Sequence, residues 1–427
     1  MRNVTKSPSA PVVVRDARVV DERSYEFITP VFGGGVRVEG PRKHRDPVTP
    51  VRAASLRGQL RFWWRAVNPR GCRTVAELSK AEAEVFGAAS SSSERVLDIA
   101  VVEAPRGYRE VGVMLPKDKF KALEGMEDIA YGAFPLRDPD AIQHGVLHEH
   151  AGTWRVVFRY GELVQQDVTA ALWAWAHFGG LGGRTRRGFG AVRQVSAGLP
   201  SIEEGFARWI AKDNRPEDVP WPALRADRAR WIATTPQVFT SGLDAQKHLL
   251  RELRRLRQGA LGRNPRSSND PRRPGRSYWP EADAIRAATG QRSRDHGQRV
   301  TQDDVYPRSA FGMPIVFHFK DRDDPKDTQL FPVHGEDTLG RLASPLILRP
   351  HALPLRVGER APSYQALALV LVHPAYDSVT LNGARVDTLL RGTLSAAEAA
   401  RIRPLHTHDE TFTDPRLRYL HLLRTGT

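Results

Sequence analysis

The chain has 427 residues, and 40% of them are hydrophobic. It is therefore long enough for two or three domains with real cores, and global disorder is excluded. Lys and Arg total 64 against 49 Asp and Glu, a net charge of +15, which attracts nucleic acid or an anionic membrane surface. An arginine-rich proteome would also give such a charge, but it would not explain why the arginines gather in a few stretches.

Cys72 is the only cysteine, which excludes an intrachain disulfide and a cysteine-rich zinc site. No apolar stretch follows the N-terminal Met1 and Arg2, so we expect no signal peptide. The longest apolar run, residues 366–372, is far too short to span a membrane. The sequence favours a soluble protein of a reducing compartment, the cytoplasm.

The first predicted elements are two strands and a basic loop. Residues 12–20 and 25–32 alternate in the manner of strands. Residues 40–50 lie between prolines and are predicted to form a surface loop. Because this loop carries Lys43 and His44 in a run of basic residues, it is a candidate anion-binding segment.

Residues 55–68 are predicted to form a helix, with Ser55 as its N-cap and Asn68, before a proline, at its end. Apolar residues recur at helical spacing and define one buried face, which includes tryptophans. Three arginines recur four residues apart and form a positive stripe: Arg57, Arg61 and Arg65. Like charges at this spacing repel by roughly a few tenths of a kcal/mol per pair. A bound anion would remove that repulsion, and so would acids from elsewhere in the fold.

Hydrophobic period and breaker residues predict the remaining elements. In chain order, these are a helix at 77–86, a loop at 88–94, strands at 96–104 and 154–160, a helix at 163–178 capped by Asp167 and closed by Gly179 and Gly180, a strand at 231–239, a helix at 244–258 with arginines crowded at one end, a loop at 259–276, strands at 313–320, 342–348 and 365–373, and a helix at 395–401. Hairpins with isolated helices favour an α+β fold.

The loop at 179–190, GGLGGRTRRGFG, is rich in glycine and arginine. Glycines let backbone N–H groups approach a ligand closely. Arg184, Arg186 and Arg187 cannot neutralise one another and require water or an anion. Phe189, the only aromatic residue of the loop, is predicted to stack on a base. Because the loop leaves the negative end of a helix dipole, its own arginines and N–H groups must supply the binding.

Established phosphate-binding motifs fit this loop poorly. Residues 183–188 have the glycine spacing of a P-loop, but Phe189 stands where a lysine must reach the phosphates. The Rossmann fingerprint is also missing. Residues 187–192, RGFGAV, match most of an RNA-recognition signature but lack its later aromatics, at Ala191 and Gln194. A ring for stacking and arginines for phosphates favour RNA as the partner.

The histidines show no specific catalytic or metal-binding spacing. Those at 144–150 and 406–408 lack the helical HExxH pattern, and exposed loop histidines explain them better. His44 is the best single candidate for the base of a metal-independent ribonuclease, which stays open as an alternative function. We expect no metal and no cofactor.

Three segments carry a family resemblance: ITPVFGGG (28–35), VRAASLRGQLRFWWRA (51–66) and GGLGGRTRRGFG (179–190). They resemble the RAMP superfamily of CRISPR effector proteins, most closely the first-named RAMP subunit of Cmr (type III-B) complexes. Further similar stretches extend the resemblance over most of the chain: 276–286, 306–319 and 343–350. The stretch 257–275 and the extreme C-terminus lie outside it.

The resemblance implies an α+β fold of two ferredoxin-like, RRM-related RAMP domains with helical and loop insertions. We expect the first domain at 1–200, a helical and basic linker with an insertion at 201–300, and the second domain at 301–427, to which a strand near 231–239 could belong. The resemblance also implies a non-catalytic subunit near the 3′ end of the CRISPR RNA. Its partners would be CRISPR RNA, target RNA, and the backbone and neighbouring head subunits of the complex.

The predicted RNA contacts combine the matched motifs with the basic stretches. They are Lys43, His44, Arg52, Ser55, Arg57, Arg61, Arg65, Gly182, Gly183, Arg184, Thr185, Arg186, Arg187 and Phe189. We assign no catalytic residue, because none of the matched motifs supplies one. A general polyanion-binding assembly scaffold is a third possible function.

Overall fold

The fold is known from a computed structural model of the chain. It describes residues 18–32, 51–88, 97–104, 108–114, 122–136, 143–148, 152–210, 216, 218–264, 275–293, 305–319, 321–355, 361–372, 378–381, 384–386 and 394–427. Helices and mainly antiparallel sheets are mixed along the chain, so the α+β prediction is confirmed.

The first sheet has the strand order β2-β5-β1-β6, and all of its neighbouring strands are antiparallel. One helix follows β1 and another follows β5, which gives the chain order βαββαβ of a ferredoxin-like unit. The elements are β1 (Arg18–Phe27), α1 (Ala53–Val67), β2 (Leu97–Glu103), β5 (Trp154–Gly161), α4 (Gln165–Phe178) and β6 (Val192–Gln194).

The second sheet, of order β11-β12-β7, repeats most of this plan. A helix follows β7 and packs on β11 and β12, and the C-terminal helix packs on β7. A fourth strand of the ferredoxin-like order is not found beside β7 among the described residues. The elements are β7 (Ile232–Phe239), α7 (Gly242–Arg257), β11 (Leu346–Ala352), β12 (Tyr364–Val370) and α10 (Pro415–Thr425). β7 corresponds to the strand near 231–239 that could belong to the second domain, and α7 from the expected linker packs with it in this second unit.

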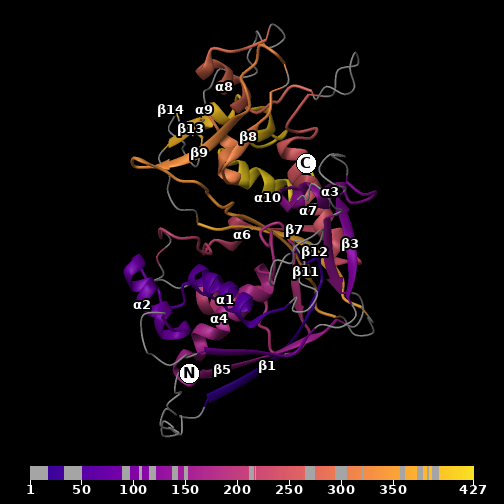
Figure 1. The fold of residues 1–427 in the computed structure, drawn as a ribbon, viewed down its shortest axis with the longest axis vertical. Helices are drawn as coiled ribbons and strands as arrows, with labels where there is room; N and C mark the ends of the chain where they lie inside the picture. The colour runs from indigo at the N-terminus through magenta and orange to yellow at the C-terminus, as the bar shows by residue number, and fades with distance from the viewer. Residues whose placement is uncertain are drawn as a thin grey trace, which may run out of the picture.

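A third, smaller body surrounds its own hydrophobic cluster. Its sheet has the path β10-β9-β13-β14, and β8 also pairs with β9. The elements are α8 (Glu281–Thr289), η6 (Pro307–Phe311), β8 (Ile315–Phe317), β9 (Thr328–His334), β10 (Asp337–Thr338), β13 (Ser378–Leu381) and β14 (Ala384–Val386). In Figure 1 this sheet and α8 lie at the end of the molecule opposite β1 and β5.

Shorter elements complete the described fold. A two-stranded sheet of β3 and β4 is inserted between β2 and β5, and α3 packs on α7. These elements are α2 (Val75–Phe86), β3 (Tyr108–Met114), α3 (Glu127–Ala133), η2 (Phe134–Leu136), β4 (Gln143–His148), η3 (Glu162–Val164), α5 (Ile202–Gly205), η4 (Phe206–Ile210), α6 (Arg228–Trp231), α9 (Ala396–Ala399) and η7 (Arg403–Leu405).

The two large sheets and their helices form alternating layers, which Figure 1 shows from the β1–β5 sheet through α1 and α4 to β11 and β12, then to α7 and α10. Leu367 and Leu369 on one face of β12 belong to the core of the first unit. Ala366 and Ala368 on the other face belong to the core built with α7 and α10. Because both faces are covered, this strand reads as a continuous apolar run rather than an alternating one.

Some local predictions were wrong. The first helix begins at Ala53 with Arg52 as its N-cap, so Ser55 lies inside it. Asp167 does not cap α4, which begins after Val164. Instead, the buried Asp167 carboxylate accepts a hydrogen bond from the indole of Trp64 at 2.8 Å.

Two further predictions differ from the structure. Gly179 closes α4 as predicted, but it does so with an extended backbone (φ −96°) and not with the left-handed conformation by which a glycine usually ends a helix. His144 and His148 lie in β4, not in a loop.

Candidate nucleic-acid interface

The glycine-rich loop, defined here as residues 179–190, joins α4 to β6 and folds tightly upon itself. Gly182 and Gly190 have positive φ angles of 85° and 61°. A Cβ on Gly190 would lie 1.8 Å from the carbonyl oxygen of Leu181, whose own N–H donates to the Gly190 carbonyl at 2.9 Å. The glycines therefore allow backbone to pack on backbone, and a ligand is not what they approach here.

The segment after β1 holds one side of this loop. Gly190 N–H donates to the carbonyl of Pro30 at 2.9 Å, and Gly183 N–H donates to that of Phe32. The buried Thr29 hydroxyl donates to the Gly188 carbonyl at 2.6 Å. Gly182 and Gly183 thus contact the chain itself, and their predicted role as RNA contacts has no support in this geometry.

Phe189 is fully buried, with 0% of its surface exposed. Its ring meets that of Phe32 edge to face, with centroids 5.1 Å apart. It belongs to the hydrophobic core built by α7, α10 and the second sheet, although it comes from the loop of the first unit. This contradicts the prediction that Phe189 stacks on a base, because an exposed ring would have to leave the core. Phe189 anchors one unit in the other.

The loop also pairs with the edge of the second sheet. Leu348 N–H on β11 donates to the Arg186 carbonyl at 3.1 Å, and Arg187 forms a parallel bridge with Leu348. Arg187 is only 9% exposed, and its guanidinium donates to the Leu346 carbonyl at 3.2 Å. Gln246 on α7 donates to the Arg187 carbonyl. The prediction that Arg187 contacts RNA is therefore wrong for this conformation, since its side chain is buried between the units.

Arg349 joins the units from the opposite direction. It is 2% exposed and lies on β11. Its guanidinium donates to the carbonyls of Ala176, at the end of α4, and Val192, at the start of β6, at 2.7 and 2.5 Å. Burial lowers the pKa of Arg349 to about 9. The joint between the units is therefore built from arginine–carbonyl contacts.

Arg184 and Arg186 are partly exposed and meet only neutral acceptors. Arg184 donates to the Gly132 carbonyl at 2.9 Å, and Arg186 donates to the Ser344 carbonyl. The Arg186 guanidinium also lies over the ring of Phe62, 5.3 Å from its centroid. Neutral carbonyls satisfy N–H groups without balancing the charge, so both cations keep their attraction for an anion.

Other arginines surround these two. Burial and repulsion from Arg341 lower the pKa of Arg186 to about 10. Burial and repulsion from Arg341 and Arg257 also lower the pKa of Arg184. Within the described parts of the chain, no carboxylate pairs with any of these four residues. We call Arg184, Arg186, Arg257 and Arg341 the loop arginine cluster.

This cluster gathers arginines from the loop, from α7 and from the segment before β11. Arg257 comes from the last turn of α7, where the sequence showed crowded arginines. Arg341 is exposed and precedes β11, and no sequence motif pointed to it. A phosphate placed between these guanidinium groups would relieve their mutual repulsion, and Arg guanidinium groups match phosphate geometry well.

The predicted arginine stripe on α1 is hydrogen-bonded by the protein and partly balanced in charge by one carboxylate. Arg61 donates to Glu82 of α2 at 2.5 Å, and Arg65 donates to the same carboxylate at 3.1 Å. Arg57 donates to the carbonyls of Phe86 and Leu97 at 2.9 and 2.6 Å. The alternative that groups from elsewhere in the fold satisfy the N–H donors of the stripe therefore fits the structure, although Glu82 alone balances only one of the three positive charges.

The remaining predicted contacts are scattered. Arg52 and Ser55 are partly exposed at the start of α1. Thr185 is partly exposed, and its carbonyl accepts from Gly188 within the loop. Lys43 and His44 lie outside the described residues.

The outer face of the first sheet does not resemble an RNA-stacking surface of the RRM type. Arg155 and Arg159 of β5 are both exposed on this face, and Arg155 pairs with Glu22 and Glu103 at 2.6 and 2.7 Å. The aromatic residues of these strands face the core instead: Tyr25, Phe27, Trp154, Phe158 and Tyr160. A partial RNA-recognition signature was therefore misleading, because its aromatic residue is in the core.

The described residues contain neither a membrane-spanning helix nor a metal-binding cluster. No helix there is long and apolar enough to cross a membrane. No group of three or more His, Cys, Asp or Glu side chains there could hold a metal ion.

Comparison with known proteins relates part of the chain to one family. Residues 24–193 match the family model of the RAMP superfamily. The CRISPR system Cmr subunit Cmr1-1 of Pyrococcus furiosus is 27% identical over 156 residues, which cover 36% of this chain and 43% of that relative. The chain thus matches less than half the length of this curated relative.

Two solved structures show weaker likenesses. The apo crystal structure of Cmr1 from Pyrococcus furiosus is 16% identical, with a TM-score of 0.44 over 84% of this chain and 89% of that chain. A chain in the cryo-EM structure of the type III-B Cmr-beta bound to cognate target RNA is 10% identical, with a TM-score of 0.43 over 94% of this chain and 99% of that chain. Such scores are too low to establish a shared fold.

Proposed function

We propose that this chain, whose residues 24–193 belong to the RAMP superfamily, is a non-catalytic RNA-binding subunit of a cytoplasmic Cmr (type III-B) effector ribonucleoprotein. The similarity to Cmr1-1 of Pyrococcus furiosus supports the assignment to that complex. The observation that carries RNA binding is the loop arginine cluster, in which four cations meet without a carboxylate partner among the described residues.

The glycine-rich loop has a structural part in this function. Its backbone is fixed by the segment after β1 and by β11, and Phe189 anchors it in the second core. Arg184 and Arg186 are thereby held at the joint between two units, beside Arg257 and Arg341. Preorganised cations bind phosphates with a smaller loss of side-chain freedom than flexible ones do. The subunit would thus bind the phosphates of the RNA backbone without sequence specificity.

The expected partners follow from the same assignment. The subunit would lie near the 3′ end of the CRISPR RNA and help to capture target RNA in antiviral defence. Backbone and neighbouring head subunits of the complex would be its protein partners. The reaction on the target would belong to another subunit, because this chain's matched motifs supply no catalytic group.

RNA affinity measured over a range of salt concentrations tests the proposal. Fluorescence anisotropy with a labelled single-stranded RNA should give a log–log salt slope of about −0.7 per phosphate neutralised. The double variant Arg184→Gln/Arg341→Gln should make that slope shallower by about 1.4, if each arginine contacts one phosphate. Arg341 has no hydrogen bond to lose among the described residues, whereas Arg184→Gln gives up the one to the Gly132 carbonyl. A thermal unfolding scan therefore establishes that the double variant is folded at the assay temperature.

A matched control removes two exposed arginines from the outer face of the first sheet. Arg155→Gln/Arg159→Gln should leave both the affinity and the slope nearly unchanged, because the proposal places no phosphate on this face and Arg155 is already paired with Glu22 and Glu103. An affinity loss in this control, with none in Arg184→Gln/Arg341→Gln, would place RNA on the sheet face instead. RNA affinity that does not respond to salt would contradict the electrostatic basis of the proposal.

A further inference from the structure

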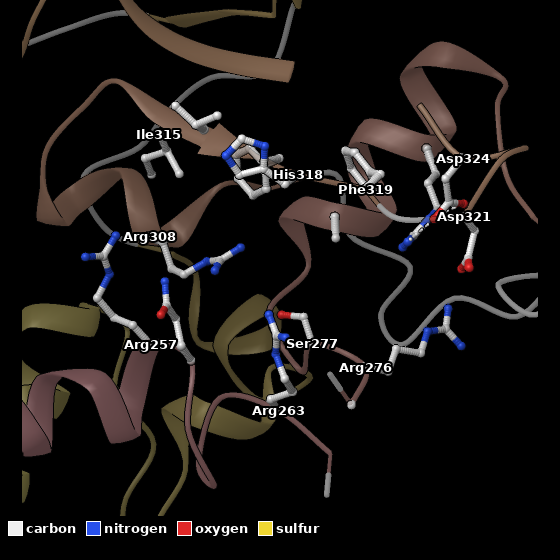
Figure 2. A pocket seen from close by; sticks show the side chains of 16 residues that line it. Arg257, Arg263, Arg276, Ser277, Arg308, Ile315, His318, Phe319, Asp321 and Asp324 are labelled. Carbon is white, nitrogen blue, oxygen red and sulfur yellow. Dashed lines mark hydrogen bonds and ion pairs between the residues drawn. The ribbon is translucent and has the colours of Figure 1, made fainter. Parts of the chain in front are cut away.

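A pocket of about 400 Å³ lies between the end of α7, α8, η6 and β8, at the base of the third body. Five arginines and two aspartates line it, together with apolar side chains from β8 and the residues after it. Figure 2 shows the guanidinium groups of Arg263 and Arg308 directed toward the middle of this pocket, whereas Asp321 and Asp324 lie on its far side. A volume of this size fits a small organic ligand.

Three of the pocket arginines are paired with carboxylates, one of which, Asp324, also lines the pocket. Arg308 pairs with the fully buried Glu281 at 3.1 Å. Arg286 donates to Asp324 at 3.0 and 2.7 Å. Arg276 pairs with Asp283 at 3.3 Å. These pairs fix the shape of the wall, because each charge is held by a specific partner.

Two pocket arginines have no such balance. Arg263 pairs with no carboxylate among the described residues, and its buried Nε has no hydrogen-bond partner there. Arg257 donates to the hydroxyl of Tyr131 at 3.2 Å, and its Nε likewise has no partner. Burial and repulsion from Arg308 lower the pKa of Arg263. The pocket lining therefore contains two arginines that have no carboxylate partner among the described residues, together with Asp321 and Asp324 on its far side.

The chemistry of these groups selects the ligand. A phosphate monoester carries a charge of about −1.5 to −2 at pH 7 and offers three acceptor oxygens, whereas a backbone phosphodiester carries a single charge. The monoester thus matches two unbalanced arginines. The apolar side chains of Ile315 and Phe319 line the same pocket and suit a nucleoside attached to that phosphate.

The pocket is also connected to the loop arginine cluster. Arg257 lines the pocket, and it is close enough to Arg184 for their charges to repel. A strand bound along the cluster would therefore reach the pocket through Arg257. We propose that this pocket binds a nucleoside carrying a phosphate monoester, as the phosphorylated end of a single-stranded RNA. The choice of RNA rests on the proposed function, while the phosphate chemistry rests on the pocket alone.

Fluorescence anisotropy with three short RNAs of one sequence tests this site. One RNA has hydroxyl groups at both ends, one carries a 3′-phosphate and one a 5′-phosphate. At least one phosphorylated RNA should bind about tenfold tighter than the hydroxyl RNA, since charge-assisted hydrogen bonds are strong. Arg263→Gln should abolish this advantage, and Arg263→Lys should restore part of it by returning the charge.

Controls separate this site from the loop arginine cluster. Arg292→Gln removes an exposed arginine outside the pocket and should keep the full advantage. The affinity of the wild-type protein for the hydroxyl RNA reports the loop arginine cluster. If the wild-type protein did not bind that RNA, the proposed function would be contradicted. If it bound all three RNAs equally, only the pocket would be contradicted.

A competition with AMP identifies the source of the phosphate. Displacement of phosphorylated RNA by AMP at a similar concentration would assign the pocket to free nucleotides, and failure to displace would assign it to an RNA end. Equal binding of all three RNAs with no effect of AMP on thermal stability would overturn the site. An advantage that survives in Arg263→Gln would also overturn it.

Discussion

Replacing Phe189 with alanine should destabilise the protein and should not act directly on RNA binding. The ring is fully buried in the core of the second unit and meets Phe32 at 5.1 Å. Truncation of a buried phenylalanine to alanine leaves a cavity in the core. Such changes lower the free energy of unfolding by about 3–5 kcal/mol. The lost edge-to-face contact falls within this cost or adds about 0.5–1.5 kcal/mol.

The measurement is the thermal unfolding midpoint, followed by RNA affinity at a temperature where the variant is folded. Phe189→Leu is the matched comparison, because leucine keeps much of the apolar volume and should lose less stability. A base-stacking residue would behave in the opposite way. An unchanged unfolding midpoint in Phe189→Ala, together with a tenfold or greater loss of RNA affinity, would refute the assignment of this ring to the core.

Two further predictions concern the joint between the units. Gly190→Ala should unfold at a much lower temperature than the wild type or fail to form the native loop. The added Cβ would lie 1.8 Å from the Leu181 carbonyl oxygen, on a residue with a positive φ. Circular dichroism on heating measures this, and a variant as stable as the wild type would show that the loop can rearrange. Burial lowers the pKa of His177, beside β11, from 6.5 to about 4. The unfolded chain then binds the proton more readily, so stability should be complete above pH 6.5 and decline by up to about 1.4 kcal/mol per unit as pH falls toward 4. Unfolding midpoints at several pH values should fall more steeply for the wild type than for His177→Gln, and equal slopes would contradict the buried, neutral state of this histidine.

The sequence by itself determined most of the local structure. Helical spacing of apolar residues placed α1, and Asn68 before a proline ended it, as the structure shows at Val67. The apolar run that forms β12 was recognised as a strand, because its composition is that of a buried one. These features depend on near neighbours in the chain, so a local pattern contains the information. The family resemblance in the first 193 residues rests on motifs of the same local kind.

Only the tertiary structure decided which polar groups remain available. Arg61 and Arg186 look alike in the sequence, each in a cluster of arginines. Glu82 pairs with the first, whereas the second donates to the carbonyl of Ser344, which lies just before β11 and far along the chain. The sequence predicted that Phe189 stacks on a base, but its ring lies in the core of the second unit. Charge balance and burial depend on contacts between segments distant in sequence, so the loop arginine cluster emerges only when the two units pack together.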